Sequence, residues 1–257
     1  MSEEPVAGSA EEPVVIQVTV GAPIETVWTH LREPDLIRRW HGWLADGLDS
    51  EIDYIFRRHA RETGTPYVLQ IDRGSEDGAW ADGGDRFELR ESEGGTTVRI
   101  TRGARGPEEM WDAWYDDITE GWTSFLQQLR FTLDAQPENI RRTIFLNVDG
   151  VDLESVRTLL GLTRLTPGAS YVVDAGDGLD LRGTGWFFSE HQVGVVGDSL
   201  GPGLLIAADK PGEQGASKGA MVILTTYGQD DADFARTVAQ WGDWWQARYP
   251  DAEGPQT

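Results

Sequence analysis

An internal repeat is the feature that most constrains the fold of this chain. The sequence IETVWTHL at residues 24–31 is matched by LESVRTLL at residues 153–160. Each segment follows a β-like run of alternating apolar residues, at 14–20 in the first copy and 143–148 in the second. A repeated order of elements at a long period indicates one structural plan used twice. We therefore expect two tandem modules rather than one module with an unrelated tail.

Both copies end in a segment with the pattern of a long amphipathic helix. In the first copy, apolar residues recur at i, i+4, i+7 and i+11, namely Ile118, Trp122, Phe125 and Leu129. The second copy has the same spacings at Phe234, Val238, Trp241 and Trp245. A stripe of this kind lies along one face of a helix and packs against a core. We expect each module to close with such a helix.

These landmarks, together with Pro137, which stops a helix, predict the domain boundaries. We expect a disordered tail at 1–13, a first module at 14–134, a linker at 135–140, a second module at 141–250 and a disordered tail at 251–257. Both tails are polar and uncapped, so we expect them to be mobile.

Between the landmarks, shorter patterns predict the remaining elements. In the first module, apolar residues at helical spacing predict an inserted helix at 48–59, and alternation predicts strands at 67–71, 86–90 and 96–101. In the second module we expect strands at 170–174, 179–189, 192–197, 203–208 and 219–227, then a helix at 231–248 capped by Asp230 or Asp231.

The opening of the first module resembles a known family. The text IQVTVGAPIETVWTHLREPDLIRRWHGW at 16–43 reads as a strand, a helix whose first turn contains Pro23, a second helix opened by Pro34, and a tryptophan. This pattern, with the closing text YDDITEGWTSFLQQLRFTL, resembles START-like (SRPBCC) domains, especially the Hsp90 ATPase activator homologue 1-like domain. The resemblance implies an α+β helix-grip fold, in which a curved antiparallel sheet wraps around a long C-terminal helix. The second copy has no counterpart to LIRRWHGW, so we expect it to be abbreviated.

The same resemblance implies an apolar cavity between sheet and helix. Its leading functional implication is non-catalytic binding of a small hydrophobic or aromatic ligand, because aromatic cavities with few polar groups suit such molecules. The ligand-binding candidates are Trp28, Trp40, Trp43, Trp122, Phe125, Leu126 and Leu129. Large aromatic residues also fill ordinary cores, so core packing is the competing interpretation for each side chain.

Two alternatives stay open. One is an enzyme similar to polyketide cyclases or aromatases that uses the same cavity, with His41 as a weak candidate for the catalytic base. Arg38 and Asp46 would assist it, and Asp46 or Asp49 could orient the imidazole; the competing interpretation of His41 is a structural histidine. The other is a protein-interaction or regulatory module, as the likeness to Hsp90 activators suggests; the protein partner is unknown.

Composition excludes several classes of function. A net charge of −22 disfavours nucleic acid and anionic membrane surfaces as partners. The absence of cysteine rules out disulfides and thiolate-ligated metals. No pair of histidines shares a helix face, and the spacing in DAGDGLD at 174–180 fits a strand-connecting turn better than a calcium loop, so no metal and no cofactor are expected. With no secretory signal and no apolar run of ~20 residues, we expect a cytoplasmic protein.

Overall fold

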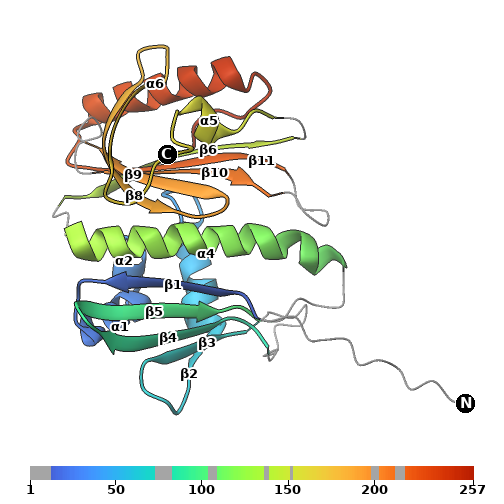
Figure 1. Cartoon of the computed structure of the whole chain (residues 1–257). Helices are drawn as coiled ribbons and strands as arrows, with labels where there is room; N and C mark the ends of the chain where they lie inside the picture. The colour runs from blue at the N-terminus through green and yellow to red at the C-terminus, as the bar shows by residue number, and fades with distance from the viewer. Residues whose placement is uncertain are drawn as a thin grey trace, which may run out of the picture.

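The computed structural model describes residues 13–72, 83–103, 109–135, 139–150, 153–197, 203–211 and 218–257, with no side-chain description for 109–114. Nearly all of the expected N-terminal tail and half of the expected linker, residues 136–138, lie outside these residues. The described part forms two antiparallel sheets with helices on their faces (Figure 1). Within that part, no helix has both the length and the apolar character needed to cross a membrane.

The first module is a five-stranded sheet with order β1-β5-β4-β3-β2. Its elements are β1 Val15–Val20, α1 Ile24–Arg32, α2 Pro34–Ile37, α3 Leu48–Asp53, the π-helical turn η1 Tyr54–Arg58, β2 Ala60–Glu62, β3 Val68–Ile71, β4 Arg86–Ser92, β5 Gly95–Thr101 and α4 Glu109–Ala135. The predicted inserted helix is therefore present as α3 and η1, while the three-residue β2 was not predicted.

The second module is a six-stranded sheet with order β6-β11-β10-β9-β8-β7. Its elements are β6 Arg141–Asp149, α5 Val156–Leu159, β7 Ser170–Asp174, β8 Asp180–Phe188, β9 Gln192–Gly197, β10 Leu204–Lys210, β11 Gly219–Tyr227 and α6 Asp231–Arg248.

The two sheets share one topology. In each, the first strand pairs antiparallel with the last strand, β1 with β5 and β6 with β11, and the intervening strands follow as a meander. Each module then ends in a long helix. This confirms the predicted α+β helix-grip fold in two copies, the second abbreviated, because the described residues between its first two strands contain a single helix, the one-turn α5.

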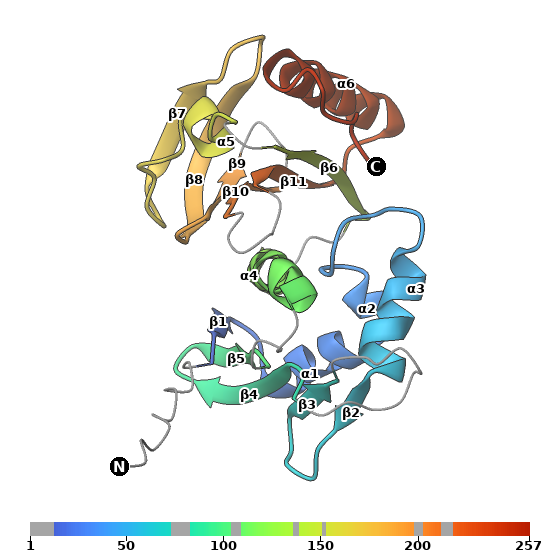
Figure 2. The same cartoon turned by 90° about the vertical axis from the view of Figure 1, so that its right-hand side faces the viewer.

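Helix α4 lies between the two sheets (Figures 1 and 2). One face carries Trp122, Leu126 and Leu129 into the core of the first module. The opposite face carries Phe131 into a second cluster, which also contains Phe145, Phe187, Leu204, Ile206, Ile223 and Tyr227 of the second sheet. Because α4 buries residues on both sides, it belongs to the interiors of both modules.

Helix α6 covers the other face of the second sheet (Figure 2). Trp241, Trp244 and Trp245 are all fully buried in that core, and the Trp244 indole donates to the main-chain oxygen of Ala175 at 2.9 Å. Asp230 caps the helix by accepting from the amide of Asp233 at 2.8 Å, as predicted. These large rings fill much of the space between α6 and its sheet.

Two segments differ from the sequence-based expectation. The segment at 153–160, which matches the first helix of the first module in sequence and was expected to be helical like it, is helical only at Val156–Leu159. Ser155 is the N-cap of this helix, and Asp209 accepts from the Val156 amide at 2.9 Å. The C-terminal segment expected to be mobile is docked: the main chains of Gln256 and Phe145 exchange two hydrogen bonds of 2.9 Å. The physical reason is that β6 is an edge strand, and its free main-chain groups take a partner.

Candidate functional site

His41 lies inside a cluster of aromatic rings in the first module. The chain leaves α2 at Ile37, whose carbonyl accepts from the His41 amide at 2.9 Å, and Gly42 then turns the chain with φ +55°, a conformation that favours glycine. The imidazole is 1% exposed. Four rings surround it with centroids 4.7 to 5.8 Å away, those of Phe125, Phe56, Trp40 and Trp122. We call these four rings the aromatic box.

The two nitrogens of His41 differ in their partners. Nε2 lies 3.1 Å from Oε1 of Glu51 on α3. This hydrogen bond holds the pKa of the Glu51 carboxyl below its usual value, against the opposing effect of burial. Nδ1 is buried and has no hydrogen-bond partner. A buried polar atom left unpaired costs about 1–3 kcal/mol, so this nitrogen is a favourable place for a partner from outside the protein.

The indoles of the aromatic box are held by their own hydrogen bonds. Trp40 donates to the main-chain oxygen of His30 at 2.9 Å. Trp122 donates to Oδ2 of Asp85 at 2.9 Å, and the other carboxylate oxygen of Asp85 accepts from Arg102 Nε at 2.8 Å. Polar groups behind the rings therefore fix the orientation of the box.

The predicted ligand-binding residues occupy different surroundings. Trp40, Trp122 and Phe125 meet around His41. Leu126 and Leu129 are buried in the same core. Trp28 and Trp43 lie apart from the aromatic box. Trp28 packs edge-on against Tyr67 with ring centroids 5.9 Å apart, and Trp43 stacks on Phe145 of the second module.

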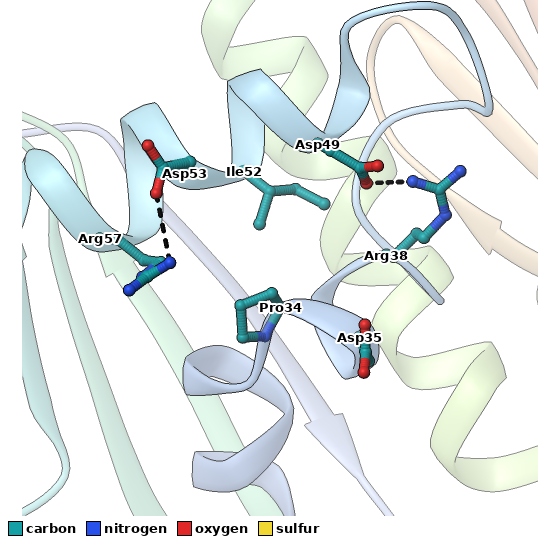
Figure 3. A pocket seen from close by; sticks show the side chains of 7 residues that line it. All are labelled: Pro34, Asp35, Arg38, Asp49, Ile52, Asp53 and Arg57. Atoms are coloured by element: carbon teal, nitrogen blue, oxygen red, sulfur yellow. Dashed lines mark hydrogen bonds and ion pairs between the residues drawn. The ribbon is translucent and has the colours of Figure 1, made fainter.

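A hollow of about 340 Å³ lies between α2 and α3 (Figure 3). Ion pairs stand on either side of it, one between Arg38 and Asp49 and the other between Arg57 and Asp53. Its remaining lining residues are Pro34, Asp35 and Ile52. Ile52 also belongs to the core cluster that contains Trp40 and Phe56, so the hollow adjoins the core of the first module at this side chain.

The residues proposed to assist His41 are not its partners. Arg38 pairs with Asp49 at the mouth of the hollow, and Asp46 is exposed. Glu51, which the sequence interpretation missed, orients the imidazole instead. The available signal was its position on the inserted helix between the apolar residues Leu48 and Ile52. Among the described residues, no three His, Asp or Glu side chains are grouped so as to hold a metal ion.

No family model and no curated protein matches this sequence. Solved structures similar to the chain include DynU16, a protein of the dynemicin biosynthetic locus, at 15% identity over 93% of this chain and 97% of that one, with a TM-score of 0.28. An AHSA1-like protein from Rhizobium etli is similar at 22% identity over 50% of this chain and 87% of its own, with a TM-score of 0.32. The di-domain ARO/CYC protein BexL of the BE-7585A biosynthetic pathway is similar at 12% identity over 93% and 94%, with a TM-score of 0.32.

Strand order and the two terminal helices decide the fold. Both modules have the helix-grip fold. The chemistry of the candidate site follows from His41, its hydrogen bond to Glu51 and its unpaired Nδ1.

Proposed function

We propose that the first START-like module binds a small aromatic or hydrophobic molecule that carries one polar group, next to His41. The observation that supports this function is the unpaired, buried Nδ1 of His41 within four aromatic rings. Aromatic rings favour edge and face contacts with a flat apolar ligand. With the imidazole proton on Nε2 facing the Glu51 carboxylate, a hydroxyl of the ligand would donate to Nδ1 and remove its desolvation cost.

The neighbouring elements suit this role. Glu51 engages Nε2, so the second nitrogen is left for the ligand. The hollow between α2 and α3 adjoins the core at Ile52. We propose that the ligand enters from this hollow by displacing the Ile52 side chain.

Two matched probes test the proposal. 1-Naphthol and naphthalene have the same ring system, and only the first carries a hydroxyl. We expect 1-naphthol to bind about 5–10-fold more tightly in equilibrium dialysis, since one hydrogen bond contributes about 1 kcal/mol. His41→Phe should abolish this preference, whereas His191→Phe, in the second module, should keep it. The proposal fails if the wild-type protein binds neither probe, or if His41→Phe retains the preference.

A second candidate function is supported by the His41–Glu51 hydrogen bond of 3.1 Å. A histidine oriented by a carboxylate is the arrangement of a general base, so acid–base chemistry on a bound aromatic ketone is the enzymatic alternative. Deuterium incorporation at the α-carbon of 1-tetralone in D2O distinguishes the two. Exchange above the buffer rate that is lost in His41→Phe indicates an enzyme; 1-naphthol binding without such exchange indicates a non-catalytic binding protein.

A further inference from the structure

We propose that Arg141, in the second module, positions His41 of the first module, so that the second module sets how well the first binds its ligand. The effect of Arg141 on ligand binding rests on the proposed function. The positioning of His41 by Arg141 rests only on the contacts between Arg141 and the main chain around His41.

Arg141 is the first residue of β6, and its guanidinium reaches across the junction to the chain that follows α2. Nη1 donates to the main-chain oxygens of Arg38 at 2.9 Å and of His41 at 3.0 Å. Nη2 donates to the main-chain oxygen of Gly42 and to Oε1 of Gln128 at 2.7 Å. One side chain of the second module therefore holds three carbonyls of the segment that carries His41.

The charge of Arg141 strengthens this contact. The side chain is 5% exposed, and burial lowers its pKa to about 10, so the guanidinium is still charged at neutral pH. The partners given above are oxygen atoms of carbonyl and amide groups, and hydrogen bonds from a charged donor are stronger than those between neutral groups. Lysine at this position would offer a single ammonium in place of the planar fork that engages four oxygens.

Gln128 on α4 completes the link. Its Nε2 donates to the main-chain oxygen of Gly42 at 3.1 Å, while Oε1 accepts from Arg141 and from the Thr225 hydroxyl at 2.9 Å. The amide of Leu44 also donates to the hydroxyl of Thr143 on β6 at 2.6 Å. The turn after His41 is thus bound by β6 of the second module and by Gln128 of the shared helix α4, which Thr225 of β11 holds in turn.

The next residue provides a matched control. Arg142 points to the other face of β6, where it pairs with Asp231 and lies over the ring of Phe234 at the start of α6. Replacing Arg142 removes a similar cation from the same strand without touching residues 38–42.

The test compares Arg141→Met, Arg141→Lys and Arg142→Met in the full chain. We expect amide hydrogen exchange at residues 38–44 to quicken about tenfold in Arg141→Met, less in Arg141→Lys, and to stay unchanged in Arg142→Met, because only the first two lose bonds to that segment. The preference for 1-naphthol over naphthalene should fall towards equality in Arg141→Met. A purely structural role would weaken both probes by the same factor and leave the preference intact. If Arg141→Met does not fold, Arg141→Lys provides the same comparison.

Two results overturn the inference: exchange at residues 38–44 in both Arg141 variants that matches Arg142→Met, or an unchanged 1-naphthol preference. If the wild-type protein binds neither probe, the proposed function is lost, and the exchange experiment alone decides whether Arg141 positions His41. The failures of the two proposals are therefore distinguishable.

Discussion

The indole of Trp43 lies flat on the ring of Phe145, with centroids 3.6 Å apart and planes 9° from parallel. Trp43 follows α2 in the first module, and Phe145 is in the middle of β6 in the second. The indole nitrogen also donates to Oε1 of Gln256 at 3.3 Å. A tryptophan expected to contact a ligand thus joins three segments at the module junction.

The stacked pair should contribute to the stability of the whole chain. We expect the single changes Trp43→Ala and Phe145→Ala to be non-additive, with a coupling energy of about 0.5–1.5 kcal/mol, because each removes the same ring contact. Urea unfolding of the two single variants and the double variant measures this value. Strict additivity would show that the stacking contributes nothing beyond the area it buries.

Asp85 should be essential for the stability of the first module. Its carboxylate accepts from Arg102 Nε, from the Gly103 amide at 3.0 Å and from the Trp122 indole. The side chains of Arg102 and Asp85 are 5% and 13% exposed. Asp85→Asn would leave a buried guanidinium without its charge partner, so we expect a loss of about 3–5 kcal/mol in the free energy of unfolding.

The control for Asp85→Asn is Glu62→Gln, which breaks the more exposed Arg32–Glu62 pair. That change should cost about 0–1 kcal/mol by the same denaturation assay. Equal losses in the two variants would contradict the role of burial.

Glu120 should make stability depend on pH in the opposite direction from a salt-bridged carboxylate. Burial raises its pKa above the ordinary value of 4.5, although a hydrogen bond from Gln192 opposes this. The folded state therefore holds the proton more tightly than the unfolded state, and stability falls as the pH rises from 4.5 through the raised pKa.

Glu120→Gln removes that dependence while retaining an oxygen for Gln192. We expect the variant to be more stable than wild type at pH 7–8 and equal to it near pH 3.5, where the carboxyl is protonated in both states. Thermal unfolding at several pH values measures the difference. A variant that is less stable than wild type at pH 7–8 would show that the charged form is the favourable one.

The docked C-terminus should stabilise β6. Deleting Pro255, Gln256 and Thr257 removes both main-chain hydrogen bonds to Phe145 and the side-chain bond to Trp43. We expect a loss of about 1–3 kcal/mol in the free energy of unfolding, measured in urea. Gln256→Ala, which keeps the main-chain bonds, should lose less than half of this. An unchanged free energy of unfolding in the deletion variant would show that the segment is a mobile tail, as the sequence predicts.

Local patterns predicted much of the fold. The strands Ser170–Asp174, Gln192–Gly197 and Gly219–Tyr227 and the helix Asp231–Arg248 match their predicted bounds, because alternation, turn residues and a cap are local signals. The contact of α4 with two sheets was not predicted. Phe131 falls outside the single stripe defined by Trp122 and Leu129, and nothing local says which sheet covers it.

The candidate site shows the same division. His41 was identified because it follows the motif that carries the resemblance, and Trp40, Trp122 and Phe125 do meet around it. Its partner Glu51 and the anchoring Arg141 were missed. The contact of Glu51 depends on how α3 is rotated, and the contact of Arg141 depends on the docking of the two modules, which brings together residues 100 positions apart in the sequence.

The shared helix α4 has a consequence for synthesis on the ribosome. The first module is complete once α4 emerges, yet the cover of Phe131 is complete only when Tyr227 of β11 appears, about 90 residues after the end of α4. During that interval the apolar face of α4 that carries Phe131 is only partly covered in the nascent chain. Nascent-chain aggregation, or capture by a holding factor, should therefore peak when translation has passed Ala135 but not yet reached Tyr227.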